Sequence, residues 1–263
     1  MANPDPAEQL LLSLGITEPD EIDLDAIAFD QGAYIRFCDL DGCEADILGY
    51  RDKAIISIDR SRSKTRQRFS IAHELGHWHH HRGQRLRCRV EEHNPNLRKI
   101  TENQANTYAA SLLLPNYLLK PRVLEYTKFN FSVIESIAND FSCSLSATAL
   151  RLVEQDYWPS MLVCHSHSGR QWFARSKSFH QRWFPKTELD PDSGAFDVLF
   201  GQAQNEKRPH LIGADAWFDN YDAQQFEMYE QTIKISKEEI LTLLTIKDDR
   251  MLEDPESSRR SYF

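Results

Sequence analysis

The sequence feature that most constrains this chain is an H-E-x-x-H pentapeptide at residues 73–77, inside the segment Gln67–Trp78. In a helix, residues four apart lie on the same face, so His73 and His77 can bind one metal ion together. Glu74 then lies beside that ion, where its carboxylate can accept a proton from a water molecule. The pentapeptide therefore predicts a helix with two metal ligands and a general base, which is the minimal equipment of a zinc peptidase.

A peptidase zinc site needs three protein ligands and one open position for water. Glu102 is the third candidate, because it opens a second predicted helix and can project from it onto the first. Asn106, one turn further on, is predicted to hold the Glu102 carboxylate in place from behind. We therefore expect one Zn²⁺ per chain, bound by His73, His77 and Glu102, with Glu74 as the catalytic base. The plain alternative is a helix that exposes two unrelated histidines, and the position of Glu102 argues against it.

The composition is that of a folded protein without a targeting signal. The chain has 263 residues, of which 41% are hydrophobic, so it can form one large domain or two ordinary ones. The polar, acidic start has no apolar region behind it, and no apolar run approaches the length of a membrane span. The five cysteines are scattered and odd in number, which favours reduced thiols. We expect a soluble, cytoplasmic protein with no membrane partner.

The net charge of −9 conceals a strong asymmetry. Residues 1–50 hold twelve acids and one base, whereas residues 51–100 hold thirteen bases and five acids, a window near +8 that contains the predicted site. A basic rim there would attract an acidic substrate or a nucleic acid. Alternatively, the basic residues form ion pairs with the acidic N-terminal segment, and the sequence leaves both interpretations open.

The pattern of apolar and turn residues predicts an α+β protein of two domains. The first, residues 1–158, is a helical zinc-peptidase domain with a small antiparallel sheet, and residues 132–154 form a helix-turn-helix-like pair. The second, residues 159–248, is a smaller α+β domain, and residues 249–263 form a flexible tail. Helices are predicted near 5–15, 64–80, 101–114, 133–141, 145–154 and 193–204, and strands near 34–38, 45–50, 54–58, 161–167, 171–175, 226–235 and 240–246.

Two segments of the chain resemble a known family. They are Ser70–His77, which contains the pentapeptide, and Glu102–Pro115, which contains the third candidate ligand. With the later segment Phe141–Leu152, they are similar to the ImmA/IrrE metallopeptidases of bacteria and their mobile elements. The resemblance covers about residues 50–155 and implies that His73, His77 and Glu102 bind zinc and that Glu74 is the catalytic base.

The resemblance also implies a substrate and a biological role. Members of the family cleave a small helix-turn-helix repressor, and this cleavage derepresses stress, mobile-element or antiviral defence genes, in some cases after DNA damage. Relatives often carry a sensory domain after the peptidase domain. Residues 159–248 are therefore expected to be regulatory, although the motifs that carry the resemblance do not extend to them.

Cys88 lies in a basic loop between the two ligand-bearing helices. The adjacent Arg87 and Arg89 favour its thiolate, which is a strong zinc ligand. Cys88 can therefore act as an inhibitory ligand that fills the open zinc position until a signal displaces it. The alternative is an ordinary free cysteine.

Two further patterns suggest nucleic acid, and each has a plainer interpretation. The pair of helices in residues 132–154 can read DNA or simply pack, and its single basic residue, Arg151, favours packing. Aromatic and basic residues are interleaved in 170–186, and Trp217 follows later; such a mixture is typical of single-stranded DNA binding and equally of a domain core. Single-stranded DNA is thus a candidate activator. The main rival to a peptidase is a DNA-binding regulator with a structural or latched zinc site.

Overall fold

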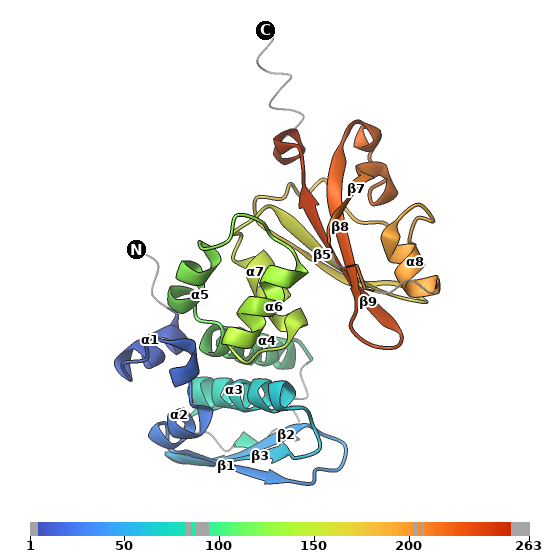
Figure 1. Ribbon diagram of the computed structural model, residues 1–263. Coiled ribbons are helices and arrows are strands. Elements are labelled where there is room, and N and C mark those ends of the chain that lie inside the picture. The colour runs from blue at the N-terminus through green and yellow to red at the C-terminus, as the bar shows by residue number, and fades with distance from the viewer. Residues whose placement is uncertain (1–4, 83–85, 88–94, 202–204, 207, 254–263) are drawn as a thin grey trace. The chain divides into compact units, whose positions relative to one another are not determined.

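The computed structural model describes residues 5–82, 86–87, 95–201, 205–206 and 208–253. The chain divides into two units (Figure 1). Unit 1 contains residues 1–125 and 137–144, and unit 2 contains residues 126–136 and 145–263. Each unit has its own sheet, so the α+β class is confirmed.

Unit 1 combines helices with one four-stranded sheet of order β1-β3-β2-β4. Its elements are α1 (Pro6–Ser13), the 3-10 helix η1 (Pro19–Glu21), α2 (Leu24–Asp30), β1 (Ala33–Cys38), β2 (Ala45–Tyr50), β3 (Lys53–Asp59), α3 (Lys64–His81), β4 (Leu86–Arg87), α4 (Pro95–Leu113) and α5 (Asn116–Val123). The helix that carries the pentapeptide and the first three strands are close to their predicted positions, whereas α2 and α5 were not predicted.

The prediction of a small antiparallel sheet is wrong, because the sheet is mixed. Strands β2 and β3 form an antiparallel hairpin, as their short connection requires. Strand β1 does not pair with its sequence neighbour β2 but lies on the far edge of β3, where it runs parallel to β3 with Ala33 opposite Ala54. Three short consecutive strands suggest successive hairpins. Here the connection from β1 to β2 passes over β3 instead, which gives two strands the same direction.

Helix α3 lies between the sheet and α4 (Figure 1). It begins after Ser63, whose hydroxyl accepts a hydrogen bond from the Arg66 amide and so caps the first turn. Its buried residues include Ile71, Leu75 and Trp78, which are at most 4% exposed. This burial on both sides holds the pentapeptide rigid, because the helix that carries it is packed from two directions.

Helix α4 begins at Pro95, six residues before the predicted start at Thr101. Proline is favoured in the first turn of a helix, where its missing N–H has no intrahelical partner. Pro95 was interpreted as the end of a polar loop, and that interpretation is wrong. As a consequence, Glu102 lies in the interior of α4 rather than at its first turn.

Unit 2 contains a five-stranded antiparallel sheet of order β6-β5-β9-β8-β7. One face of it packs against α8 and the 3-10 helices, around the buried rings of Phe179, Trp183, Trp217 and Phe218. Its elements from residue 160 onward are β5 (Ser160–Ser166), β6 (Gly169–Arg175), α8 (Gly194–Phe200), β7 (His210–Gly213), η2 (Ala214–Ala216), η3 (Ala223–Gln225), β8 (Glu227–Lys234), β9 (Glu239–Ile246) and η4 (Asp249–Leu252).

The edge strand β7 was not predicted, because it has only four residues and polar neighbours. At the other end of the unit, residues 249–252 of the predicted tail form η4, and the Trp183 indole N–H donates to the Met251 carbonyl at 2.8 Å. Residues 254–263 lie outside the described part of the chain.

Two helices, α6 (Phe131–Asp140) and α7 (Leu145–Glu154), occupy the predicted helix-turn-helix segment. Ser142 between them has a left-handed φ of 51°, which makes the turn. Two of the residues that a DNA-reading helix would present, Thr148 and Arg151, are buried.

Within the described residues, no helix is both long and apolar enough to cross a membrane.

Candidate metal centre

The side chains of His73, His77 and Glu102 converge from α3 and α4. The Nε2 atoms of the two histidines are 3.1 Å apart. Oε2 of Glu102 lies 3.4 Å from His73 Nε2, and its Oε1 lies 3.6 Å from His77 Nε2. The helix period sets the first distance, and the packing of α4 on α3 sets the other two.

These distances fit one tetrahedral ion. Zinc binds imidazole nitrogen and carboxylate oxygen at about 2.0–2.2 Å, so neighbouring ligand atoms of a tetrahedron lie roughly 3.3–3.6 Å apart. The two histidine–carboxylate separations of 3.4 and 3.6 Å, one to each Glu102 oxygen, fall in that range, and the 3.1 Å between the imidazole nitrogens is slightly shorter. Two imidazoles and one carboxylate are also the donor set of a peptidase zinc with one open position. The three residues therefore form a candidate metal site that fits zinc.

Asn106 supports the site, but through a different residue from the one predicted. The sequence suggested that it would hold the Glu102 carboxylate. Instead, its Oδ1 lies 3.0 Å from Nδ1 of His73. The His73 ring reaches Glu102 with one nitrogen and Asn106 with the other, so Asn106 can fix the tautomer in which Nε2 is free to bind metal.

Gly76 allows α3 and α4 to approach closely enough for this geometry. A Cβ atom at this position would lie 2.9 Å from both the Cα and the carbonyl oxygen of Ala105. Only glycine fits against the neighbouring backbone without displacing it. Sequence reasoning quoted Gly76 within the pentapeptide but gave it no role. A glycine inside an otherwise helical pattern was the available signal.

Glu74 lies next to the ligands and is 2% exposed. Burial raises the pKa of its carboxyl to about 8, and the negative charges of Asp46 and Glu102 add to the shift. A cation bound by the neighbouring histidines would act in the opposite direction, because an opposite charge favours the ionised form. The surroundings thus suit a carboxyl group that gains and loses a proton near neutral pH.

The imidazole of His77 is held in its neutral form. Burial is the largest cause of its lowered pKa of about 4, and the neighbouring His73, His81 and His80 contribute in turn. Metal binding requires a neutral imidazole, so no proton has to be removed from His77 before it can act as a ligand at neutral pH.

The site opens into a pocket of about 460 Å³. Side chains from the start of β2 and the first turns of α3 complete its wall. The lining residues are Glu44, Ala45, Arg66, Phe69, Ser70, His73, Glu74, Glu102 and Asn106. His73 and His77 are only 16% and 8% exposed at the side chain, whereas Glu102 is 40% exposed. Two of the three ligands, His73 and Glu102, therefore line a pocket that is open to solvent, and His77 lies beside them.

Ion pairs account for part of the basic window. Arg60 pairs with Asp39 at 3.2 Å, Arg62 pairs with Asp59 at 3.2 Å, and Arg66 pairs with Glu44. These three arginines therefore form ion pairs with nearby acids, and two of the acids, Asp39 and Glu44, lie in the acidic N-terminal segment. Arg66 is also part of the pocket wall, where its charge is already balanced by Glu44.

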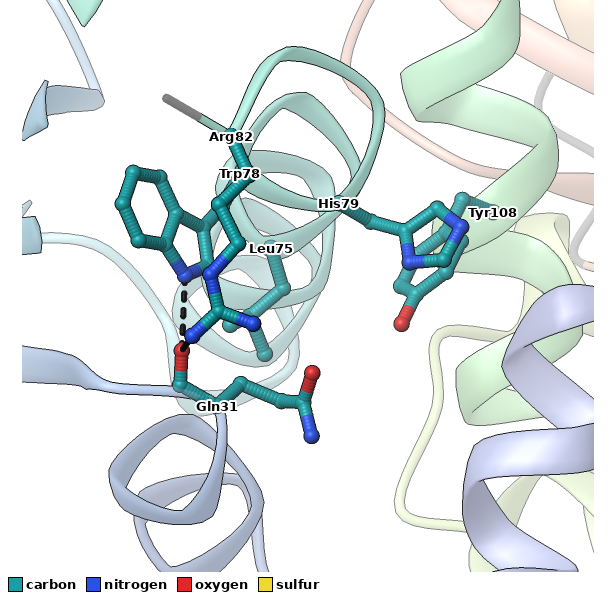
Figure 2. Close-up of a pocket in the computed structure, with 6 residues that line it drawn as sticks. All are labelled: Gln31, Leu75, Trp78, His79, Arg82 and Tyr108. Carbon is teal, nitrogen blue, oxygen red and sulfur yellow. Dashed lines mark hydrogen bonds between the residues drawn. The ribbon is translucent and has the colours of Figure 1, made fainter. Parts of the chain in front are cut away.

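A second pocket, of about 300 Å³, lies on α3 and shares no residue with the first (Figure 2). The Trp78 indole N–H and the Arg82 guanidinium both donate to the Gln31 carbonyl, at 2.8 and 2.7 Å. Arg82 also stacks over the Trp78 ring. This cluster fixes the C-terminal half of α3 to the end of α2 and so helps to orient the ligand helix.

Two further predictions concern Cys88 and the aromatic residues of unit 2. Cys88, the suggested inhibitory ligand, lies outside the described residues, so its latch role stays a prediction. Among the aromatic residues considered for single-stranded DNA, Phe179, Trp183 and Trp217 are buried in the core of unit 2. Trp172 and Phe184 are 38% and 56% exposed, and Arg170 stacks over Phe184.

The comparisons with known proteins agree with the class that this site defines. Residues 28–153, which contain all the ligands, match the IrrE N-terminal-like domain, a metallopeptidase domain. The chain therefore contains an IrrE N-terminal-like domain, the domain of the ImmA/IrrE metallopeptidases. No curated protein sequence matches it. A solved structure titled "Mycobacterium tuberculosis transcriptional regulator" is similar in fold, with a TM-score of 0.58 and 15% identity, over 95% of this chain and 80% of the other.

Proposed function

We propose that this protein is a zinc-dependent endopeptidase that cleaves a helix-turn-helix transcriptional repressor. The observation that carries the proposal is the convergence of His73 Nε2, His77 Nε2 and the Glu102 carboxylate within 3.1–3.6 Å beside an open pocket. The match of residues 28–153 to a metallopeptidase domain also supports it, because that segment includes every ligand.

In this proposal the residues have distinct tasks. His73, His77 and Glu102 hold the zinc, which when bound supplies a Lewis acid that activates water and polarises a peptide carbonyl. Asn106 orients the His73 ring. Glu74 takes the proton from the attacking water and delivers it to the leaving amine, a transfer that suits a carboxyl group with a raised pKa.

The substrate class follows from the family, whose members cleave small repressors. Cleavage would derepress stress, mobile-element or antiviral defence genes. The similarity in fold to a protein titled transcriptional regulator favours a role in gene control. We further propose that residues 159–248 form a regulatory domain, and that DNA damage or single-stranded DNA triggers cleavage. The exposed Trp172 and Phe184 are among the side chains available for stacking on bases.

The rival function is a DNA-binding regulator with a structural or latched zinc. It requires the helix pair α6–α7 to present polar side chains to DNA. Thr148 and Arg151 of α7 are 0% and 9% exposed, which disfavours that use. Within the described residues, three candidate ligands converge beside a pocket, which is the protein donor count of a catalytic zinc site. Cys88, the candidate fourth ligand of a latched site, lies outside those residues.

Incubation of the purified, zinc-loaded chain with a helix-turn-helix repressor from the same genome, encoded beside it where there is one, tests the proposal. Mass spectrometry should find a defined cut by the wild-type protein, with or without added single-stranded DNA, and none by the Glu74→Gln variant. Glu125→Gln, which changes an exposed carboxylate elsewhere, should cleave normally. An intact repressor after incubation with zinc-loaded wild-type protein under both conditions would exclude a repressor peptidase.

A further inference from the structure

A second cluster of potential metal ligands lies in unit 2, at the start of the edge strand β7. Glu206, His210 and Glu230 offer ligand atoms that all lie within 4.8 Å of one another. His210 on β7 is directly opposite Glu230 on β8 in the sheet register. Side chains of such a cross-strand pair start close together, so the sheet itself fixes two of the three positions.

The two carboxylates are oriented by hydrogen bonds that leave further lone pairs available. Glu230 accepts from the Ala195 amide at 2.7 Å and from the Trp217 indole N–H at 2.9 Å. Glu206 accepts from the Thr232 amide through Oε2, while its Oε1 faces His210. Each carboxylate oxygen can accept more than one bond, and metal-binding carboxylates are themselves usually held by such donors.

Gly194 leaves the space that the cluster occupies. A Cβ atom at this position would overlap Oε1 of Glu206 and lie 2.7 Å from Cε1 of His210. Any larger residue would therefore push both side chains out of place. The absence of a side chain at Gly194, which is not itself a ligand, is therefore required for the observed positions of Glu206 and His210.

The charge of the cluster calls for a cation. Glu230 is 0% exposed, and in the described part of the chain its recorded ion pair is with His210 alone. Two ionised carboxylates beside a neutral imidazole would carry a charge of −2. Without a metal ion, protons offset part of that charge, because burial raises the pKa of Glu230 and the hydrogen bond with Glu206 raises the pKa of His210. Burying such charge is costly unless a counter-charge is bound.

The two carboxylates face different nitrogens of the His210 ring. His210 Nδ1 lies 3.0 Å from Glu206 Oε1, which is a hydrogen-bond distance. Its Nε2 lies 4.0 Å from Glu230 Oε2, which is too long for a hydrogen bond. A metal ion on Nε2 with bonds of about 2.0–2.2 Å spans that second gap, and the Glu206 carboxylate then has to turn from Nδ1 towards the same ion. Without an ion, no direct hydrogen bond joins His210 to Glu230, whose Oε2 accepts from the Trp217 indole N–H.

We propose that Glu206, His210 and Glu230 bind a divalent transition-metal ion, such as Zn²⁺ or Mn²⁺, in unit 2. One nitrogen and two carboxylate oxygens suit these ions better than Ca²⁺ or Mg²⁺, which prefer oxygen alone. His210 is 40% exposed at the side chain, so an ion can enter from solvent. This inference does not depend on the peptidase function, since the two sites share no residue.

The test is the number of ions bound per chain, measured by plasma mass spectrometry after chelation and dialysis against Zn²⁺ or Mn²⁺. The wild-type chain should hold two Zn²⁺ ions, and the His73→Ala/His77→Ala variant should keep one. The Glu206→Gln/His210→Gln variant should also hold one and should keep peptidase activity towards the repressor. His167→Gln, which changes an exposed histidine of the same unit, should hold two.

Gly194→Ala provides a second variant that removes no ligand. It should raise the dissociation constant of the ion that remains in the His73→Ala/His77→Ala protein by about tenfold or more, as displaced supporting groups do at other metal sites. The inference is wrong if His73→Ala/His77→Ala binds neither Zn²⁺ nor Mn²⁺, or if Glu206→Gln/His210→Gln holds as many ions as the wild-type chain. Circular dichroism of each variant separates loss of the ion from loss of the fold.

Discussion

The two candidate metal sites consist of the same residue types, histidine and glutamate, but in different ratios and on different secondary-structure elements. In unit 1, two histidines and one glutamate meet on two packed helices. In unit 2, one histidine and two glutamates meet at the edge of an antiparallel sheet. The first set has the donors and the open pocket of a catalytic zinc site, whereas the second has more negative charge and its most buried ligand in a core.

The comparison explains why one site is visible in the sequence and the other is not. Helix periodicity keeps His73 and His77 four residues apart, so the pair forms a short motif. Sheet register instead joins His210 to a residue on another strand, with no fixed spacing along the chain. A helix-borne site is therefore local in sequence, and a sheet-borne site is not.

The largest expected effect is on the rate of repressor cleavage in the Glu74→Gln variant, and it should involve only the site in unit 1. We expect repressor cleavage to fall by about 10²–10⁴-fold, which is the usual contribution of a general base. Both sites should keep their metal, because Glu74 is not a ligand at either. Cleavage rates and metal content of the same preparation measure the two effects. Normal cleavage by Glu74→Gln would mean that the base is another residue.

Asn106→Ala should weaken metal binding only in unit 1. Loss of a residue that orients a ligand typically costs about 10–100-fold in metal affinity, and Asn106 contacts His73 alone among the ligands. Competition with a chromogenic chelator measures the dissociation constant. Asn103→Ala, an exposed asparagine on the same helix, is the matched control and should bind as tightly as the wild-type protein. Equal affinities for the two variants would contradict the role of Asn106.

The two glycines that border the sites should behave differently. Gly76→Ala forces a Cβ against the Ala105 backbone, so we expect a loss of about 1–3 kcal/mol in the free energy of unfolding. Gly194→Ala meets the movable ends of Glu206 and His210 and should change the stability of the metal-free protein by less than about 1 kcal/mol. Urea denaturation of the metal-free variants measures both. A Gly76→Ala protein as stable as the wild type would show that α3 and α4 need not approach so closely.

Much of the first site could be predicted, because each of its parts leaves a local signal. His73, Glu74 and His77 lie in one pentapeptide, and Glu102 lies in an amphipathic helix. The predicted contact of Asn106 with Glu102 differs from the observed one with His73, because the sequence of one helix does not show where the side chains of the facing helix lie. The predicted antiparallel sheet was wrong for a related reason, since the neighbours of β1 depend on how the chain crosses β3. The role of Gly76 in the close packing of the two helices depends on Ala105, which is distant in the sequence.

The most direct test of the account is X-ray absorption at the zinc edge of the Glu206→Gln/His210→Gln variant loaded with one Zn²⁺, so that only the site in unit 1 is occupied. We expect two imidazole ligands and carboxylate oxygen at about 2.0–2.2 Å from the zinc. When His77→Ala is added to the same variant, one of the two imidazole ligands should disappear. A zinc ion with fewer than two imidazoles, or one unaffected by His77→Ala, would contradict the convergence of His73, His77 and Glu102 on which the proposed peptidase rests.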